Sequence, residues 1–393
     1  MSKQLKLGLI PKIIIGILLG VIIGKFLPEA IIRIFVTFSS GFGSFLGFIV
    51  PLLILGFVTA GIAELGTGAG KLLAITVGLS YGFTLISGLF AYTLGKSFLP
   101  KFISAEAAKT IGEAGAELKP YFSMPMPPVM GVTTALILAF ILGLGIAAIK
   151  SEDLKKLALD FQKIITKVIE NIVIPLLPLH ILGIFANMTK SGQVVSVFSV
   201  FGKVFLMVII AHITIIVFQF VIGAAIGKKN LFECLKFQVP GYLTALGTQS
   251  SAATIPVNVQ CSEKMGISKG VREFVIPLCA TTHMSGSTIT LTTCAMAVMM
   301  LNGMPIQFNG FFGFIAMLGI SIVAAPGVPG GAVMASLGLL ESMLGFNQTM
   351  LSLMIALYIA QDSFGTACNV TGDQAVAMIV DRVYEDKTVS VSV

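Results

Sequence analysis

The stretch LFECLKFQVPGYLTALGTQSSAATIPVNVQCSEKMG, residues 231–266, contains two apolar arms, each too short to cross a membrane comfortably. The arms meet at a small polar tip, TQSSAAT (248–254). A second stretch, FNGFFGFIAMLGISIVAAPGVPGGAVMASLGLLESMLGF (308–346), has the same plan with the tip AAPGVPGGA (324–332). Neither tip carries a charge, although a solvated loop of this length usually does. The pattern favours two re-entrant helical hairpins with buried tips over ordinary loops between helices.

The composition indicates a polytopic membrane protein. Of 393 residues, 56% are hydrophobic and only 11% are charged, which leaves too little polar surface for a soluble globule. The net charge of +7 would suggest nucleic acid in a soluble protein. Here many lysines and arginines lie in short segments between apolar runs, where they orient the chain in the bilayer. We therefore expect a lipid bilayer and no nucleic acid as partner.

The apolar runs predict the number of membrane spans. Segments of about 20 residues or more lie near 7–27, 32–64, 72–98, 129–149, 168–189 and 194–227, and a longer apolar segment follows each hairpin. The expected fold is therefore an all-α polytopic membrane protein with eight transmembrane helices and two re-entrant helical hairpins of opposite orientation. We expect the polar stretch at 99–128 to be an extramembrane loop.

Basic residues predict the topology. Lysines near the start of the chain, at 150–167 and at 228–236 suit the cytoplasmic side, whereas no lysine or arginine occurs from Glu273 to Asp381. The first hairpin should therefore enter from the cytoplasm and the second from outside. We expect both termini to be cytoplasmic and the protein to lie in the cell inner (plasma) membrane.

Two oppositely oriented hairpins, each followed by a broken helix, correspond to the inverted-repeat plan of secondary transporters. In this plan the binding site lies near the bilayer midplane, where the hairpin tips meet. We expect residues 1–227 to form the membrane region of the first six helices, most of them scaffold, with the third and sixth accompanying the transport core. Residues 228–383 should form that core, and 384–393 a cytoplasmic tail.

The last apolar segment contains AQDSFGTACNVTGD, residues 360–373, with two carboxylates in an apolar run. On a helix, Asp362, Thr366, Asn369 and Asp373 share one stripe. A carboxylate inside a bilayer costs at least about 2.5–3.5 kcal/mol and usually faces a cavity or a partner. Because this half has no lysine or arginine, we expect imported partners: an ammonium for Asp362 and a hard cation for Asp373. Asn369 could instead hold neighbouring helices together through hydrogen bonds.

Four motifs carry a family resemblance. SSAATIPV at the first tip, PLCATTHMSG after it, GVPGG at the second tip and QDSFGTACNVTGD in the last helix resemble the signatures of the dicarboxylate/amino acid:cation symporter family. Among its members, TQSSAATIPVN, ITLTT and AQDS are most similar to the bacterial sodium/serine-threonine symporters. The predicted order of helices and hairpins matches along essentially the whole chain.

The resemblance implies a role for each matching position. Asp362 matches the aspartate that pairs with the substrate amino group, Asn369 the asparagine that meets the α-carboxylate, and Asp373 a sodium-site carboxylate. Further substrate positions are Ser250, Ser251, Val328 and Thr366. Backbone carbonyls near Cys279, His283 and Asn369 would complete the shell of one sodium ion, and those near Thr281 and Ala324 would hold a second.

Three positions depart from the family pattern. Gly365 stands where carriers of acidic amino acids have an arginine, so a second substrate carboxylate would be buried without a counter-charge. The substrate should therefore be small and neutral. Ser285 replaces the aspartate of a third sodium site, which suggests fewer coupled ions. His283 replaces an asparagine and is either a neutral packing residue or a proton-sensitive group; His180 and His212 have no visible partner and no assigned role.

These observations predict a sodium-coupled symporter for small neutral amino acids, most of all L-serine and L-threonine, with no enzymatic activity. The resemblance implies elevator-type alternating access and a homotrimer. A dicarboxylate or alanine carrier or exchanger of the same family, and a cation channel, remain as alternatives. An intramembrane aspartyl protease needs a close pair of carboxylates, whereas Asp362 and Asp373 are about 16 Å apart along a helix.

Overall fold

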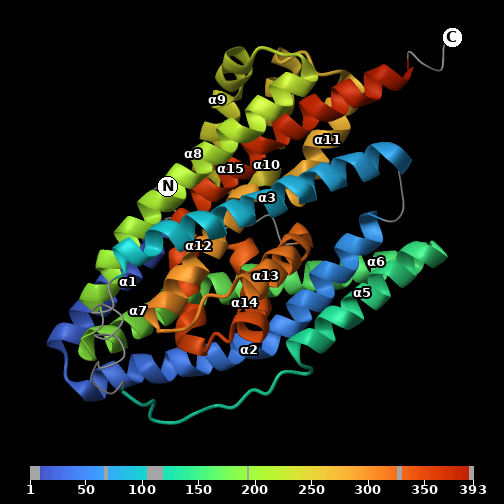
Figure 1. Ribbon diagram of the computed structural model, residues 1–393. Coiled ribbons are helices and arrows are strands. Elements are labelled where there is room, and N and C mark those ends of the chain that lie inside the picture. The colour runs from blue at the N-terminus through green and yellow to red at the C-terminus, as the bar shows by residue number, and fades with distance from the viewer. Residues whose placement is uncertain (1–8, 66–69, 104–117, 193, 325–329, 389–393) are drawn as a thin grey trace, which may run out of the picture.

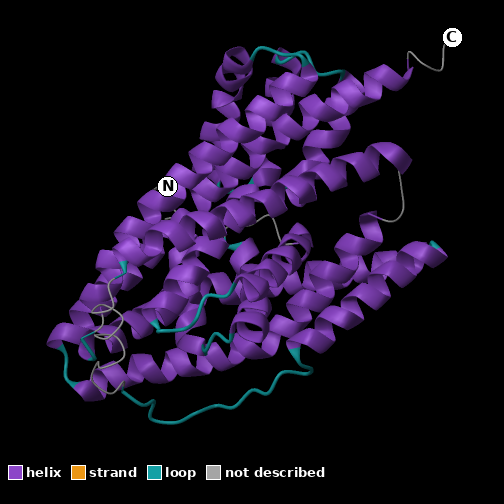
Figure 2. Cartoon of the chain, in the orientation of Figure 1, coloured by secondary structure: helices purple, strands orange, loops and turns teal. Residues whose placement is uncertain are grey.

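A computed structural model describes residues 9–65, 70–103, 118–192, 194–324 and 330–388. Within these ranges every regular element is helical (Figures 1 and 2), so the all-α prediction is confirmed. The elements are α1 Leu9–Phe26, α2 Glu29–Leu65, α3 Gly70–Phe102, α5 Val132–Ile149, α6 Glu152–Val168, η1 Ile169–Val173, α7 Ile174–Lys190, α8 Val194–Gly227, α9 Leu231–Thr248, α10 Ser251–Lys264, α11 Lys269–Thr282, α12 Ser285–Leu301, α13 Phe308–Ser321, η2 Ile322–Ala324, α14 Gly331–Leu344 and α15 Gln348–Thr388.

Six helical segments of the described residues, some of them made of two consecutive helices, are long and apolar enough to cross a membrane. One of them, formed by α6, the π-helical turn η1 and α7, starts at Glu152, whereas hydropathy predicted a start near 168. The difference arises because α6 is amphipathic and rich in lysine, which lowers its mean hydropathy although it forms a regular helix. Ser151 caps that helix, since its hydroxyl accepts a hydrogen bond from the backbone N–H of Leu154.

The helices pack in two groups (Figure 1). In the first, α1 packs on α7, and α2 packs on α5, α6 and α7. In the second, α3, α8, α9, α11 and α12 surround α15. The pair α13–α14 contacts both groups, because α13 packs on α3 and α14 packs on α2 and α15. This arrangement places the second helical hairpin between the two groups of helices.

Hairpin 1, defined as α9 and α10, turns over two residues. Helix α9 ends at Thr248, and the next residue, Gln249, adopts a left-handed backbone (φ 54°). Ser250 caps α10 by accepting a 3.2 Å hydrogen bond from the N–H of Ala253. Hairpin 2, defined as α13 and α14, passes through the 3-10 turn η2, and its second arm begins after Gly330. Residues 325–329 of its tip lie outside the described residues. In both hairpins the second arm therefore begins at the tip, with its N-terminal N–H groups there.

The two helices that follow the hairpins differ from each other. Helix α11 ends before His283, and α12 starts at Ser285, so this helix is broken at His283 and Met284 as predicted. The Met284 N–H leaves the helical ladder and donates a 3.1 Å hydrogen bond to Oγ1 of Thr84. By contrast, α15 is continuous from Gln348 to Thr388, so the expectation of a second broken helix is wrong. The polar residues of this segment therefore lie on an intact helix, and both of its aspartates near the centre bond to groups from other segments.

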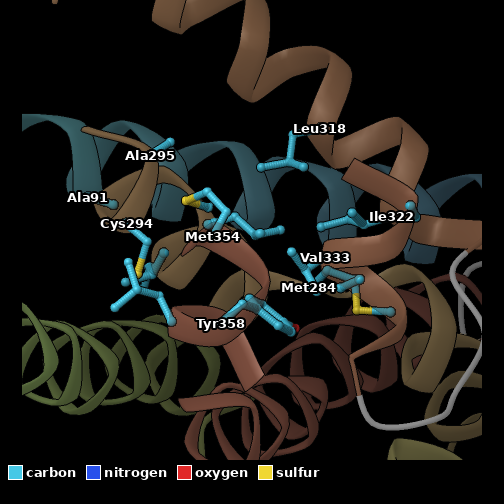
Figure 3. Packing of buried hydrophobic residues seen from close by; sticks show 14 of the residues in the cluster. Ala91, Met284, Cys294, Ala295, Leu318, Ile322, Val333, Met354 and Tyr358 are labelled. Carbon is cyan, nitrogen blue, oxygen red and sulfur yellow. The ribbon is translucent and has the colours of Figure 1, made fainter. Parts of the chain in front are cut away.

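The core of the molecule lies around α12 and α15. Within the most apolar window of each span, 94% of the residues are buried for α11–α12 and 89% for α15, against 61% or less for the other spans. Figure 3 shows this packing, in which Tyr358 and Met354 of α15 join Met284 and Val333 in one cluster. These two helices are thus shielded on all sides by protein, so polar groups on them must find protein partners or ligands.

Candidate functional site

The first aspartate of α15 is bonded to the tip of hairpin 2. Asp362 is 4% exposed, and its Oδ2 accepts a 2.7 Å hydrogen bond from the backbone N–H of Gly330. Gly330 adopts φ 80°, a conformation that glycine tolerates far better than other residues. The side chains of Tyr358 and Thr366 lie beside the same carboxylate. A bond from the hairpin backbone therefore stabilises this carboxylate, while the ammonium partner expected for Asp362 stays a prediction.

Asn369, one stripe position further along, caps the start of α12. Its Oδ1 accepts hydrogen bonds from the N–H groups of Gly286 (2.7 Å) and Ser287 (3.3 Å). Its Nδ2 donates a 3.0 Å bond to Oγ of Ser287, which also accepts a 3.0 Å bond from the Tyr358 hydroxyl. The amide thus satisfies N–H groups that the helix break leaves free. Asn369 fixes the position of α12 relative to α15.

The second aspartate of α15 pairs with the histidine at the helix break. Nδ1 of His283 lies 3.1 Å from Oδ1 of Asp373 and 3.1 Å from the carbonyl of Asn369. Both residues are buried, with 0% and 1% of their surface exposed. Oδ2 of Asp373 has no hydrogen-bond partner among the described residues. One carboxylate oxygen is therefore held by the imidazole, and the other remains available to a ligand.

Gly365 faces α12 rather than open space. A Cβ atom at this position would lie 3.7 Å from the carbonyl carbon of Gly286 and from the backbone nitrogen of Ser287, which are ordinary contacts. A side chain at the facing residue of α12, Gly286, is not tolerated, because its Cβ atom would collide with the Gly365 carbonyl oxygen. Helices α12 and α15 cross here with their backbones close together, directly beside the hydrogen bonds of Asn369.

Hairpin 1 is fixed to α15 by a buried amide cluster, defined as Gln238, Asn258, Gln374 and Ser262. Nδ2 of Asn258 donates a 2.8 Å bond to the carbonyl of Val370. The Asn258 Oδ1 accepts from Gln238 (2.7 Å) and Gln374 (3.1 Å), whose Oε1 accepts from Ser262 (2.7 Å). These bonds join both arms of the hairpin to the turn of α15 between Asn369 and Asp373. They hold the first tip at a fixed place relative to the two aspartates.

The remaining predicted positions are distributed around these contacts. Ser250 and Ser251 form the first tip, and Ala245, just before it, packs on Ala367 and Val370 of α15. Cys279 is buried in the last turn of α11, with its sulfur 3.4 Å from Oγ of Ser80. Thr281 is exposed, and its hydroxyl bonds to the carbonyl of its own helix at Leu278. Ala324 ends η2, which packs against α11; Val328 lies outside the described residues.

Several side chains of this site were missed by the sequence analysis. Tyr358 lies one helical turn before Asp362, so the spacing used for the aspartate stripe could have identified it. Gln219 is a polar residue in the apolar run of α8, and it contacts Ser285 and His283. The histidines without visible partners also have them: His180 bonds to Ser352 and His212 to the Gly286 carbonyl. These partners come from distant segments, so no local pattern indicates them.

A helical chain with six helices able to span a membrane, and with two buried aspartates beside paired helical hairpins, has the architecture of a membrane transporter. Residues 9–383 match the family described as the Sodium:dicarboxylate symporter family, and the chain belongs to it. It is therefore a transporter rather than an enzyme, and membership implies sodium coupling. The resemblance found in the sequence motifs is confirmed.

The chain is similar over most of its length to a protein named as a serine/threonine transporter. The chain is 27% identical over 345 residues to the serine/threonine transporter SstT of Streptococcus suis (strain 05ZYH33). The match covers 84% of this chain and 93% of the relative. The similarity therefore extends over both groups of helices rather than over a single motif.

Proposed function

We propose that the protein is a sodium-coupled symporter of small neutral amino acids, with L-serine and L-threonine as preferred substrates. The observation that carries this proposal is the combination of Asp362, held by a hairpin backbone N–H, with a glycine at position 365. The first feature provides an anionic partner for an amino group. The second leaves the site without a cation for a second carboxylate.

The substrate ammonium would bind Asp362 in exchange for the N–H of Gly330. An ammonium brings a full positive charge and three donors to this carboxylate, whereas the backbone brings one neutral donor. Substrate binding and the position of the hairpin 2 tip are then linked, because both use the same oxygen. This supports hairpin 2 as the element that closes over the substrate.

The substrate carboxylate would lie at the tip of hairpin 1. Helix α10 begins there, and the partial positive charge at a helix N-terminus favours an anion. Ser250 and Ser251 add hydroxyl groups at the same end, and the amide cluster holds this tip in place. A substrate hydroxyl would find polar partners in Thr366 and the tip serines, which favours serine and threonine over alanine.

Sodium would bind at Asp373. Oδ2 of this buried residue lacks a hydrogen-bond partner among the described residues. The other oxygen ligands nearby are backbone carbonyls such as that of Asn369. A carboxylate with carbonyl oxygens is the donor set that suits a hard cation. The two ions of the predicted shells would use the carbonyls near Cys279, His283 and Asn369, and those near Thr281 and Ala324. Each bound ligand raises the affinity of the other when both order the same hairpin.

Transport would occur by an elevator-type movement. The second group of helices would move together with both hairpins and carry substrate and sodium across the first group. The first group would form the scaffold of a homotrimer in the inner (plasma) membrane. Eight helices would span the bilayer, hairpin 1 would enter from the cytoplasm and hairpin 2 from outside. The termini would be cytoplasmic, as the distribution of lysine and arginine indicates.

Uptake of labelled L-serine into proteoliposomes under an inward sodium gradient tests this proposal, with L-threonine, L-alanine and L-aspartate as competitors. We expect saturable, sodium-dependent accumulation that threonine inhibits and aspartate does not. Strong inhibition by aspartate would establish a dicarboxylate carrier instead. Flux that does not saturate and does not accumulate substrate against its gradient would establish a channel.

A further inference from the structure

The imidazole of His283 is surrounded by polar side chains from three helices. In addition to Asp373 of α15 at its Nδ1, its Nε2 lies 2.8 Å from Oγ of Ser285 on α12 and 3.3 Å from Nε2 of Gln219 on α8. Gln219 also donates a 2.8 Å hydrogen bond to Ser285. All four side chains are buried. Gln219 lies outside the sequence motifs that predict the other positions of the site.

The hydrogen bonds of the cluster have only one consistent direction around a neutral imidazole. Nδ1 faces two acceptors, Oδ1 of Asp373 and the Asn369 carbonyl, so it carries the proton. Nε2 is then an acceptor, and the Ser285 hydroxyl donates a hydrogen bond to it. Oγ of Ser285 in turn accepts from the amide N–H of Gln219. This order fixes the orientation of the Gln219 amide, because its nitrogen must face Ser285.

The fixed orientation leaves two oxygen atoms without donors. Oε1 of Gln219 and Oδ2 of Asp373 both lack a hydrogen-bond partner among the described residues, and both are buried. An unsatisfied buried acceptor typically costs about 1–3 kcal/mol, and more when it is charged. Two such atoms in one cluster are what a bound cation would satisfy together.

Gly372 shows that Oε1 of Gln219 lies beside the turn of α15 that carries Asp373. A Cβ atom on Gly372 would collide with both Cε1 of His283 and Oε1 of Gln219. Cε1 lies between the two ring nitrogens, and Nδ1 bonds to Asp373, the next residue after Gly372. Oε1 of Gln219 therefore lies along the Nδ1–Cε1–Nε2 edge of the imidazole, beside the backbone that carries Asp373.

We propose that Gln219 of α8 is a ligand of the sodium ion that Asp373 binds, with its Oε1 entering the coordination shell together with Oδ2 of Asp373. The neutral imidazole of His283 and the hydroxyl of Ser285 position the two oxygens, and they make no direct contact with the ion through their side chains. This inference rests on the proposed sodium site and adds a ligand from a helix outside the hairpin repeats.

The test measures sodium binding without substrate, as the sodium-dependent rise in Tm of the purified, detergent-solubilised protein, with choline as control cation. The variant Gln219→Met keeps the volume and removes the oxygen. We expect the sodium concentration for half-maximal stabilisation to rise about tenfold or more, as when groups around other metal sites are removed. Thr214→Val, an exposed change on the same helix, should leave it unchanged.

A second variant separates a ligand from a structural group. Gln219→Glu keeps an oxygen but loses the amide donor to Ser285, so sodium affinity should stay within about threefold of the wild type, or increase, if the oxygen binds the ion. Loss of affinity in Gln219→Glu equal to that in Gln219→Met would overturn the proposal, as would an unchanged response in Gln219→Met. A wild-type protein without any sodium response would instead refute the proposed function itself.

Discussion

The backbone N–H of Gly330 and the carboxylate of Asp362 form a 2.7 Å hydrogen bond between the tip of hairpin 2 and the centre of α15. Thirty-two residues separate the two positions in sequence, and both are buried. The bond occupies the oxygen that we assign to the substrate amine. Under the proposed function, hairpin position and substrate binding would depend on each other at a single atom.

Replacement of Asp362 by asparagine should weaken serine binding strongly. The neutral amide keeps the shape of the side chain but removes the charge that attracts the ammonium, a loss of at least about 2 kcal/mol or roughly thirtyfold in affinity. Isothermal titration of serine at saturating sodium measures this. Glu341→Gln, which removes an exposed carboxylate of α14, is the matched control and should bind serine normally. Normal serine affinity in Asp362→Asn would exclude Asp362 from the amine site.

Introduction of an arginine at Gly365 should change the substrate preference. A Cβ atom at this position makes only ordinary contacts with α12, so the first atom of a new side chain fits there. The guanidinium would offer a second carboxylate its missing counter-charge. We expect aspartate to become an effective competitor of serine uptake in Gly365→Arg, and Gly365→Met to show no such gain. Equal inhibition by aspartate in both variants would show that the charge of the arginine is not the cause of the changed preference.

Removal of the Asn258 side chain should destabilise the protein. Asn258→Ala leaves the Val370 carbonyl and the amides of Gln238 and Gln374 without their shared partner, at about 1–3 kcal/mol for each group that stays unsatisfied. A decrease in Tm by several degrees is expected, measured by thermal unfolding in detergent. Gln260→Ala, an exposed change on the same arm, should leave Tm unaltered. An equal Tm for both variants would show that the amide cluster adds no stability.

The contact between His180 and Ser352 joins α7 of the first helix group to α15 of the second. The Ser352 hydroxyl donates a 2.7 Å bond to the carbonyl of Gln348, so it accepts the 2.9 Å bond from Nε2 of His180. Ser352→Ala leaves this N–H unsatisfied and should disfavour the present arrangement of the two groups.

If the second group moves against the first, the serine uptake rate of Ser352→Ala should change by about threefold or more, with little change in serine affinity at equilibrium. Stopped-flow uptake and titration measure the two quantities. Ser342→Ala removes a hydroxyl that bonds within its own helix and is the matched control. A change in affinity without a change in rate would assign Ser352 to the binding site rather than to the interface.

The sequence by itself determined the helical class, the membrane location and the stripe on α15. These follow from hydropathy and from the 3.6-residue period, which are local properties of the chain. The stripe from Asp362 to Asp373 lies on one buried helix, and the break at His283 is where the motif predicted it. The family was also recognisable, because its motifs are short and continuous in sequence.

Only the tertiary structure decided how the polar groups of the site are paired. The bonds of Asp362 to Gly330, of Asn369 to the start of α12 and of Gln219 to Ser285 join positions 32, 83 and 66 residues apart. No periodicity reaches over such separations, since which helices meet depends on the packing of the whole chain. The same reason explains why the partners of the two aspartates on α15 could not be predicted: Gly330 lies at a hairpin tip and His283 at a helix break, both distant in sequence.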